Sequence, residues 1–232
     1  FDECPPGDAP YDYAAKSLNL TCRWLERCFE RYAATRPKYG YRQSLFPIVQ
    51  GCTYPDLRTR SAEFVQQFDA DGYAIGGLAV GEPAPVMYEM IELVNGILPT
   101  DRPRYLMGVG TPQNILESVE RGVDFFDCVY PARNGRHGHA YTNHGKLNLF
   151  NAKYERDDRP LDEDCGCPVC RRYSRSYIRH LLKAKEMLGL RCMVTHNLWF
   201  YNHLMEEIRE AIEQGCFQEY KKKKLESMEE LK

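Results

Sequence analysis

The stretch Tyr105-Leu106-Met107-Gly108-Val109-Gly110-Thr111-Pro112 decides the fold class of this chain of 232 residues. A short apolar run ends in glycines, and Thr111-Pro112 then supplies a helix cap and a proline suited to the first helical turn. Similar apolar runs cover residues 45–49, 73–75 and 125–129, with helical patterns between them. Strands that recur roughly every 20–30 residues with a helix between them are typical of parallel βα units. The sequence therefore predicts an α/β fold with a parallel sheet.

Polar or glycine residues directly follow each predicted strand, namely Gln50-Gly51, Gly76-Gly77, Gly108 and Asp127. In a (β/α) barrel such positions gather at the C-terminal face, where catalytic groups lie. Residues 1–4 look like the end of a fifth strand, and five strands are too few to close a barrel of eight. An open doubly wound sheet is the competing architecture, although the sequence has neither a GxGxxG turn nor a GxxxxGK[ST] loop to favour it.

Changes of pattern along the chain predict three regions. Residues 1–130 carry the βα units, and residues 131–196 combine a basic, glycine-bearing loop at 131–139 with a cysteine-rich insert. Residues 197–232 hold a final barrel helix, over about 198–214, and a charged tail that we expect to fray from residue 221 onward. A further basic helix is expected over residues 171–188.

Composition and charge exclude several classes of protein. Hydrophobic residues make up 43% of the chain and charged residues 28%, which is typical of a globular chain with a core and excludes wholesale disorder. No apolar run reaches the ~18 residues of a membrane-spanning helix, so we expect no membrane association. With 31 basic and 33 acidic residues the net charge is −2, which still permits a local basic surface for nucleic acid. The chain begins without Met or a leader and reads as part of a longer protein.

Three of the ten cysteines lie within a span of six residues. Cys165, Cys167 and Cys170 form a C-x-C-x-x-C motif, and His196 follows them. Three thiolates and an imidazole are the ligand set of a structural zinc site with no open position for catalysis. Cys192 is the rival fourth ligand, but it lies in an apolar stretch where a free cysteine behaves as a small hydrophobic residue. One metal site in a reducing cytoplasm explains the uneven spacing better than five disulfide bridges.

Asp127 is the one charged residue in an apolar run, between Phe126 and Cys128. A carboxylate buried in a strand is costly unless it is paired or used, and the alternative is a solvated strand end or a cap on a backbone amide. The following loop contains Arg133 and Arg136, whose planar guanidinium groups suit phosphate or base edges. Most arginines in polar loops are simply solvated, so these residues are candidates for function and no more.

Taken together, six ordered segments of the chain resemble one family. They are Phe1-Asp2-Glu3-Cys4, Ile48-Val49-Gln50-Gly51, Gly76-Gly77-Leu78-Ala79-Val80-Gly81-Glu82, Tyr105-Leu106-Met107-Gly108-Val109-Gly110, Phe126-Asp127-Cys128-Val129-Tyr130-Pro131-Ala132-Arg133, and the cysteine cluster followed by Thr195-His196-Asn197. The family is the tRNA-guanine transglycosylases, and the resemblance extends over essentially the whole chain. Its fold implies that this chain is the C-terminal part of a (β/α)8 TIM barrel with an inserted zinc-binding subdomain and one structural zinc ion.

The activity that the resemblance implies is a base exchange. Members of the family remove guanine from the wobble position of tRNA anticodons and install a 7-deazaguanine, on the route to queuosine. Asp127 matches the family's nucleophile, which attacks the ribose C1′ and forms a covalent ribosyl-enzyme ester. Such a carboxylate can trap an oxocarbenium-like transition state, as in retaining glycosidases.

The resemblance also assigns a pocket for the base. Asp2 matches the residue that accepts hydrogen bonds from the base N1–H and exocyclic amine, while Gln50 and the backbone N–H of Gly77 match donors to the base oxygen. The wobble nucleotide must leave the anticodon stack to reach such a pocket. The base-binding positions that match are Asp2, Cys4, Gln50, Gly77, Leu78 and Met107.

The expected partner is the anticodon loop of tRNA. Arginines and loop backbone are a usual means of recognising single-stranded RNA bases. Cys4 and the segment that begins at Leu78 resemble the bacterial form, whose incoming base is 7-aminomethyl-7-deazaguanine. The positions that match tRNA contacts are Gly108, Val109, Gly110, Thr111, Pro112, Gln113, Asn114, Ala132, Arg133, Asn134, Gly135 and Arg136.

Two residues depart from the family pattern. Cys52 follows Gly51 where a further glycine is usual, and Ala132 stands where threonine is common. The N-terminal part of the barrel, with a second aspartate assigned to general acid–base work, has no counterpart here. We therefore expect this chain alone to be inactive. Family members commonly dimerise through the zinc region, which makes a homodimer the expected assembly.

Two alternatives to an enzyme of this family stay open. One is a non-catalytic tRNA-binding subunit, which keeps the fold and the zinc but lacks the catalytic groups. The other is a zinc module appended to an unrelated barrel hydrolase. Four residues present together argue against the first: Asp2, Gln50, Gly77 and Asp127.

Overall fold

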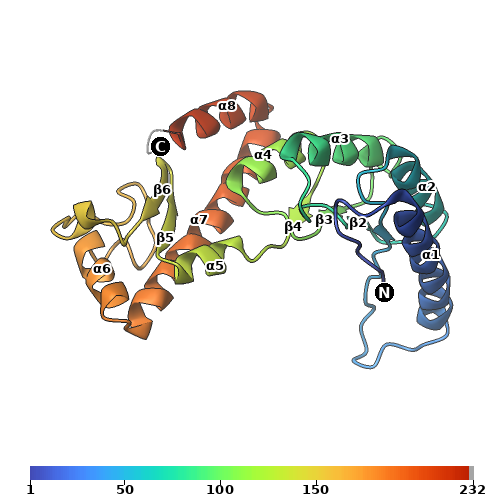
Figure 1. Cartoon of the computed structure of the whole chain (residues 1–232), viewed down its shortest axis with the longest axis horizontal. Coiled ribbons are helices and arrows are strands. Elements are labelled where there is room, and N and C mark those ends of the chain that lie inside the picture. The colour runs from blue at the N-terminus through green and yellow to red at the C-terminus, as the bar shows by residue number, and fades with distance from the viewer. Residues whose placement is uncertain (230–232) are drawn as a thin grey trace. The chain divides into compact units, whose positions relative to one another are not determined.

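The computed structural model in Figure 1 describes residues 1–229 of the chain. The chain divides into two compact units, Phe1–Cys128 and Val129–Lys232. Among the described helices, none combines the length and the apolar composition that crossing a bilayer requires.

The first unit is a parallel α/β sheet, as the sequence predicts. Its four strands are hydrogen-bonded in the order β1-β2-β3-β4, and every neighbouring pair is parallel. Figure 1 shows the helices of this unit arranged around one side of the sheet. In chain order the elements are α1 (Tyr11–Ala33), β1 (Ile48–Val49), α2 (Pro55–Val65), β2 (Tyr73–Ile75), α3 (Ala84–Asn95), β3 (Arg104–Leu106), α4 (Pro112–Glu120) and β4 (Phe125–Phe126).

The core of this unit lies between the strands and the helices. Val49 in β1, Ile75 in β2 and Leu106 in β3 are each 0% exposed, and all three belong to one hydrophobic cluster. Helix α3 packs onto them because its apolar residues recur at helical spacing, with Met87, Met90, Ile91 and Val94 all buried. Complete burial of an aliphatic side chain of this size contributes about 1.5–3 kcal/mol.

Two local predictions in this unit have opposite outcomes. The Thr111 side chain accepts a hydrogen bond from the Asn114 N–H and Pro112 occupies the first turn of α4, so the predicted helix start is confirmed. The fifth strand predicted at residues 1–4 is wrong, because none of these residues is in a strand. The Glu3 N–H donates to the Thr21 hydroxyl oxygen at 3.0 Å, so a helix side chain takes the place of a neighbouring strand.

The second unit is built around a long helix and an antiparallel hairpin. Strands β5 and β6 pair from His139 opposite Asn148 to Thr142 opposite Gly145. In chain order the elements are α5 (Tyr130–Arg136), β5 (His139–Thr142), β6 (Gly145–Asn148), the 3-10 turn η1 (Ala152–Tyr154), α6 (Arg175–Lys183), α7 (Met187–Glu213) and α8 (Phe217–Ser227).

Residues 131–139 were expected to form a loop, and this prediction is wrong, because α5 covers most of them. Gly135 lets α5 approach α7 closely, since a Cβ at Gly135 would lie 3.0 Å from the Val194 backbone nitrogen. The Asn197 side-chain amide of α7 also donates to the Pro131 and His139 carbonyls, both at 2.9 Å. Tertiary packing therefore makes a helix of a segment whose composition is typical of loops.

The boundaries of the later helices also differ from those predicted. Helix α6 begins only after Ser174, whose hydroxyl accepts from the Tyr177 N–H, so the helix expected over residues 171–188 is shorter. Helix α7 begins at Met187 instead of residue 198, because polar residues that interrupt its apolar pattern are buried. His196 and Asn197 are both 0% exposed.

The charged tail is more ordered than predicted. Lys224 in α8 is only 9% exposed, and its ammonium donates to Glu207 Oε2 and Asn143 Oδ1, both at 2.7 Å. Tyr220 also donates to Glu207 Oε2 at 2.7 Å. The expected fraying from residue 221 is therefore wrong for α8, and residues 230–232 lie outside the described part of the chain.

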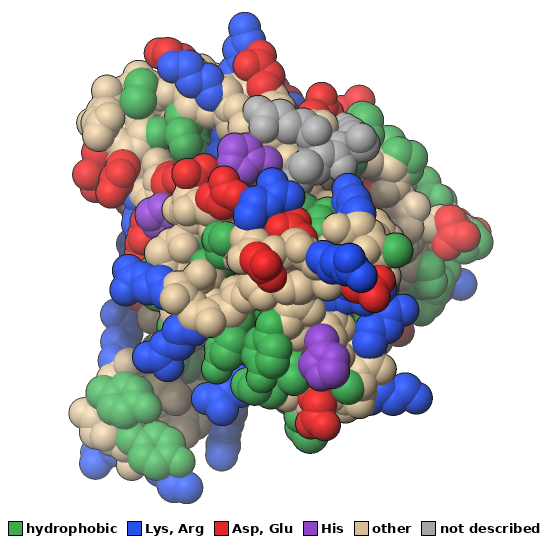
Figure 2. Space-filling model, turned by 90° about the vertical axis from the view of Figure 1, so that its left-hand side faces the viewer, with side chains coloured by type: hydrophobic (Ala, Val, Ile, Leu, Met, Phe, Trp, Pro, Cys, Tyr) green, Lys and Arg blue, Asp and Glu red, His purple; other side chains and the backbone are tan. Residues whose placement is uncertain are grey.

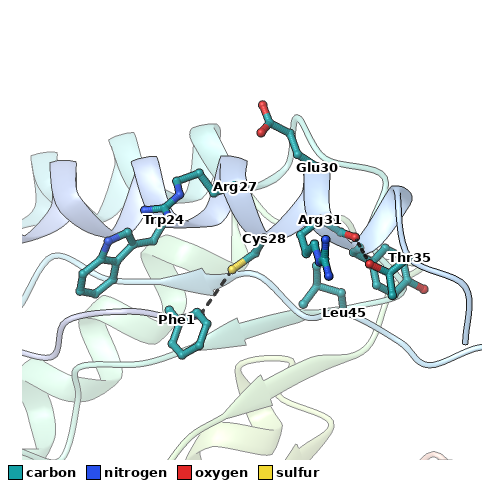
Figure 3. Close-up of a pocket in the computed structure, with 9 residues that line it drawn as sticks. Phe1, Trp24, Arg27, Cys28, Glu30, Arg31, Thr35 and Leu45 are labelled. Atoms are coloured by element: carbon teal, nitrogen blue, oxygen red, sulfur yellow. Dashed lines mark hydrogen bonds between the residues drawn. The ribbon is translucent and has the colours of Figure 1, made fainter. Parts of the chain in front are cut away.

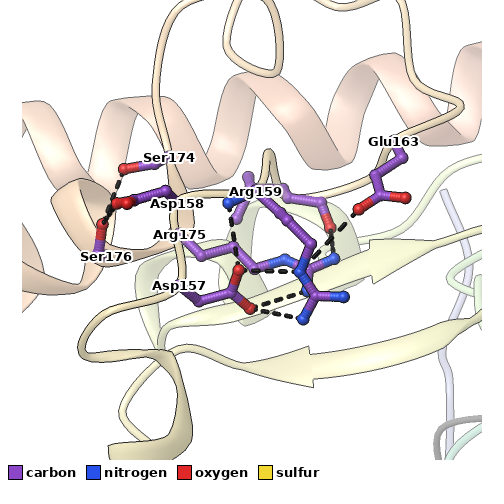
Figure 4. A network of polar contacts seen from close by, with 8 residues as sticks. Asp157, Asp158, Arg159, Glu163, Ser174, Arg175 and Ser176 are labelled. Carbon is purple, nitrogen blue, oxygen red and sulfur yellow. Dashed lines mark hydrogen bonds and ion pairs between the residues drawn. The ribbon is translucent and has the colours of Figure 1, made fainter.

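An aspartate between two arginines joins the segment before the cysteines to α6, as Figure 4 shows. Asp157 accepts from Arg159 Nε at 2.9 Å and Nη2 at 2.8 Å, and from Arg175 Nη1 at 3.1 Å. Arg175 also donates to the Leu161 carbonyl at 3.1 Å. The hydrogen bonds from Arg159, and then those from Arg175, outweigh burial and hold the pKa of Asp157 well below its usual range.

This network predicts an acid-sensitive contribution to stability. The folded state lowers the pKa of Asp157, so the stabilisation is complete above the unfolded-state value of about 3.9 and is lost as the pH falls below it. We expect Asp157→Asn to lower the melting temperature at pH 7, with the difference from wild type shrinking towards pH 3. The control is Asp158→Asn, whose carboxylate is exposed and, within residues 1–229, accepts only from Ser176 Oγ at 3.1 Å. A difference that stays constant with pH would contradict this account.

Candidate active site and metal centre

The candidate active site lies at the carboxyl ends of the four parallel strands. Gln50 follows β1, Gly76 follows β2, Met107 follows β3 and Asp127 follows β4. The strand residues just before them are paired across the sheet as Val49 with Ile75, Ile75 with Leu106, and Leu106 with Phe126. Parallel pairing therefore places the four following residues at one edge of the sheet.

Gln50 and Asp2 are in direct contact there. Gln50 is 1% exposed, and its Nε2 donates to Asp2 Oδ2 at 2.7 Å. Its Oε1 is buried without a hydrogen-bond partner among the described residues. Ser61 Oγ accepts from the Gln50 backbone N–H at 3.0 Å and holds this residue from α2. The structure thus brings together two of the residues predicted to bind the base, although they are far apart in the sequence.

Gly77 packs against Gln50 in a backbone conformation that favours glycine. Its φ is +63°, and a Cβ at this position would lie 2.2 Å from Gln50 Oε1. A hydrogen bond from the Gly77 backbone N–H favours the thiolate of Cys4, but partial burial and the neighbouring Asp2 carboxylate outweigh it and raise the pKa of Cys4. Leu78 is 3% exposed and belongs to the core cluster of this unit.

Asp127 is exposed and lies just beyond β4, which contains only Phe125 and Phe126. Of the two readings that the sequence left open, a carboxylate buried in a strand and a solvated strand end that bonds a backbone amide, the structure has the second. Asp127 Oδ1 accepts from the Tyr105 hydroxyl at 2.6 Å and from the Gly108 N–H at 2.9 Å. The hydrogen bonds of the described chain leave Oδ2 free, so the carboxylate is oriented through one oxygen and available through the other.

An aromatic stack supports Tyr105 in this contact. The Tyr105 and Phe125 rings are stacked with centroids 4.7 Å apart and an interplanar angle of 3°, and Phe46 meets Phe125 edge-on at 5.8 Å. Partial burial, and then the hydrogen bond to Asp127, raise the pKa of Tyr105 to about 12. The phenol therefore stays protonated at neutral pH and acts as a donor.

Residues 108–114, the segment of this unit predicted to contact tRNA, include several that are buried or that stabilise the start of α4. Val109, Gly110 and Pro112 are buried, whereas Gly108 and Gln113 are exposed. The remaining two residues stabilise the start of α4, since Thr111 is its cap and Asn114 Oδ1 accepts from the Tyr88 hydroxyl at 2.8 Å.

The corresponding segment of the second unit is the helix α5. Arg133 and Arg136 are exposed and lie three residues apart, which places them on neighbouring positions of one helix face. Ala132 is half-buried, Gly135 is buried against α7, and Asn134 Oδ1 accepts from Lys146 Nζ at 3.0 Å. Basic and acidic side chains are interspersed on the face shown in Figure 2, so charge on this face does not by itself identify a ligand.

The second unit also holds the candidate metal centre. Cys165, Cys167, Cys170 and His196 present ligand atoms that all lie within 4.8 Å of one another. The three sulfurs lie 3.7, 3.5 and 3.4 Å from His196 Nδ1. A tetrahedral zinc site with its usual bond lengths requires about 3.6 Å between sulfur and nitrogen. The four residues can therefore hold a metal ion without rearrangement.

The protonation of His196 also suits a metal ligand. Its Nε2 lies 2.8 Å from the Tyr141 backbone oxygen, which can only accept, so Nε2 carries the proton and Nδ1 presents its lone pair to the sulfurs. Cys192 is 3% exposed and belongs to the surrounding apolar cluster instead of this ligand group. Of the two candidate fourth ligands, the structure brings His196 to the cysteines.

One cavity of the first unit is separate from these groups. It is an apolar groove of about 1020 Å³ that runs along α1 and includes Phe1, Trp24, Cys28 and Leu45 (Figure 3). It contains neither Asp127 nor any of the residues predicted to bind the base.

Three residues of the first unit were given no role by the sequence. Tyr105 reads as an ordinary strand aromatic, and Arg58 reads as a solvated residue of a helix turn. Glu82 accepts from the Ala79 and Val80 backbone N–H groups, the latter at 3.0 Å, and so closes the turn after β2. The roles of these three side chains become visible only from their hydrogen-bond partners in the fold, and no spacing in the sequence indicates those partners.

Comparisons with known proteins identify the family. A family model described as "Queuine tRNA-ribosyltransferase" matches residues 1–230. A queuine tRNA-ribosyltransferase of Lachnoclostridium phytofermentans is 64% identical over 229 residues, and one of Clostridium botulinum is 58% identical over 228 residues. Each match covers 97% of this chain and 61% of the relative. The chain thus spans 61% of the length of the curated relatives it matches, and it belongs to the queuine tRNA-ribosyltransferase family.

Proposed function

We propose that this chain is the C-terminal portion of a tRNA-guanine transglycosylase that exchanges guanine at the anticodon wobble position for 7-aminomethyl-7-deazaguanine. One observation carries the proposal: Asp127 is oriented by Tyr105 and Gly108 through Oδ1, with Oδ2 free, at the sheet edge that also bears Gln50 and Gly77. A nucleophile needs an accessible lone pair held in a defined direction, and this carboxylate has one.

The reaction proceeds by two displacements at the ribose C1′. Asp127 Oδ2 attacks C1′ as the bond to guanine N9 breaks, and the bonding electrons leave with the base. The deprotonated N9 of the incoming 7-deazaguanine then attacks C1′ and releases the Asp127 carboxylate. Two inversions retain the configuration at C1′, and one N-glycosidic bond replaces another, so no energy-rich cofactor is consumed.

The residues around Gln50 bind the exchanging bases. Asp2 accepts from the base N1–H and exocyclic amine, and it is held by Gln50 Nε2, which has a second hydrogen for the base oxygen. The Gly77 N–H is the second donor to that oxygen, and Met107 packs on a ring face. Cys4 and Leu78 border the position of the 7-substituent.

The anticodon loop contacts the two predicted segments, residues 108–114 and 132–136. Arg133 and Arg136 are exposed on α5 and carry charge that suits phosphates or base edges. The joint presence of Asp2, Gln50, Gly77 and Asp127 favours an enzyme over a non-catalytic tRNA-binding subunit.

The four-stranded sheet is part of a (β/α)8 barrel whose other strands belong to the longer protein. Strands β1 and β4 are the edges of the described sheet, and each presents unpaired backbone groups. We infer that the chain alone does not turn over, because the strands that would pair with those edges and the second aspartate of the family are then missing. Full guanine exchange by the isolated chain of 232 residues would refute this inference.

The metal held by Cys165, Cys167, Cys170 and His196 is zinc, and its role is structural. Three thiolates and one imidazole complete a tetrahedron and leave no position for a water or substrate. The ion would join the turn at residues 165–170 to the middle of α7, so it stabilises the second unit without taking part in the chemistry.

Substitution of the proposed nucleophile tests the function. In the chain extended to the full length of its relatives, we expect a covalent protein–RNA adduct on a denaturing gel when a 9-deazaguanine inhibitor traps the intermediate. Asp127→Asn should abolish the adduct and lower kcat on the order of 10⁴-fold or more, because the amide is a poor nucleophile. An adduct that persists in the variant would assign the nucleophile elsewhere.

Tyr105→Phe tests the orientation of Asp127. Loss of one hydrogen bond to a charged group should lower kcat roughly 10- to 100-fold, while the phenyl ring keeps the stack on Phe125 and KM changes little. Steady-state guanine exchange measures both constants. The matched control is Tyr88→Phe, which removes a hydroxyl that bonds Asn114 in the same unit; equal losses in both variants would show that Tyr105 acts only through folding.

Metal content and stability test the zinc centre. Atomic absorption should find one zinc ion per chain, and a chelator should lower the melting temperature, since metal binding contributes to folding. His196→Ala should weaken zinc binding on the order of 10²-fold or more. Cys192→Ala is the control and should keep its zinc; loss of zinc from this variant instead of the histidine variant would reverse the assignment.

A further inference from the structure

Arg58 is a buried cation directly beneath the candidate base site. It lies in α2, and its side chain is 0% exposed. Its Nε donates to the Cys52 carbonyl at 2.7 Å, Nη1 to Gly76 at 2.7 Å and Val49 at 3.3 Å, and Nη2 to Gly77 at 2.8 Å. All four acceptors are carbonyls at the carboxyl ends of β1 and β2.

The charge of Arg58 is not neutralised by an ion pair with any carboxylate of the described residues. Burial lowers its pKa to about 10, so the guanidinium remains charged at neutral pH. Burial of an unpaired charge is unfavourable, and four carbonyl dipoles compensate only part of its lost hydration. Only arginine has donors in a planar fork that can reach four carbonyls of two loops, whereas the lysine ammonium is a single point.

We propose that Arg58 is a positioning residue for base binding. It sets the direction of the Gly77 N–H and holds the backbone on both sides of Gln50. This inference rests on the proposed function. In a planar trans peptide the C=O and the next N–H point in opposite directions. Because Arg58 holds the Gly76 carbonyl, the Gly77 N–H must point away from it, and this N–H does face Cys4. Arg58 likewise holds the Gly77 carbonyl and so directs the Leu78 N–H.

The same cation fixes the other loop of the site. The carbonyls of Val49 and Cys52 flank Gln50-Gly51 on both sides, and Arg58 binds both of them. Arg58 therefore joins the two loops that carry the donors to the base oxygen. A departing guanine gains negative charge, and a positive charge fixed behind its donors stabilises that charge without reorganisation.

Buried arginines in the same unit provide a matched comparison. Arg104 is the first residue of β3, so it lies at the opposite end of the strand from the proposed site. It is 7% exposed, and its Nη2 donates to the Asn95 and Leu98 carbonyls.

In the chain extended to the full length of its relatives, Arg58→Lys should raise KM for the base about 10-fold, since the charge remains but the fork is lost. Arg58→Met should also lower kcat on the order of 10²-fold. Arg104→Met should lower the melting temperature but leave both constants within about 2-fold of wild type.

A second measurement uses the chain as it is. Hydrogen exchange at the Gly77 and Leu78 amides should be faster in Arg58→Lys and Arg58→Met than in wild type, and unchanged in Arg104→Met. If wild type exchanges guanine while both Arg58 variants keep their kcat and KM, the inference is overturned. If wild type exchanges no guanine, the proposed function fails, and unchanged amide exchange in the Arg58 variants would then also reject the positioning role.

Discussion

Parallel pairing of four short strands is the constraint on which the candidate active site depends. Gln50, Met107 and Asp127 each directly follow a strand, and Gly77 is the second residue after β2. The ends of these strands are level with one another in the sheet. A register shift of one residue in any strand would turn its following side chain to the opposite face. The buried residues Val49, Ile75 and Leu106 oppose such a shift, because each would lose its place in the core. The apolar core of the first unit thus determines the geometry of polar groups that lie outside it.

The second unit depends on a different constraint, the pair His196-Asn197 in the middle of α7. His196 Nδ1 faces three cysteine sulfurs, while both functional ends of the Asn197 amide bond the backbone of α5 and β5. Adjacent residues of one helix therefore secure the cysteine turn on one side and the hairpin and α5 on the other. Both side chains are fully buried, so each unmet hydrogen bond would carry the full cost of desolvation.

Features set by local sequence were predictable, and features set by distant contacts were not. Periodicity indicated the βα order, Thr111-Pro112 marked the start of α4, and cysteine spacing indicated a metal centre with His196 or Cys192 as fourth ligand. Helix α5 escaped prediction because its stability comes from Gly135 against α7 and from Asn197. The order of α8 depends similarly on the contact of Lys224 with Glu207. The sequence shows that Asn197, Lys224 and Glu207 are polar, but it does not show which partner each of them bonds in the fold.

Arg58 and Asp127, two charged groups of the proposed site, are held by opposite means. Arg58 is enclosed and bound by four carbonyls, so it cannot move, lose its proton at neutral pH or meet a substrate directly. Asp127 is exposed just beyond the edge strand β4, and the hydrogen bonds of the described residues hold it through one oxygen. A group that must form and break a bond needs access, whereas a group that sets a field and a backbone direction needs rigidity. The separation of these demands between an enclosed cation and an accessible carboxylate explains why one side chain lies under the sheet edge and the other projects from it.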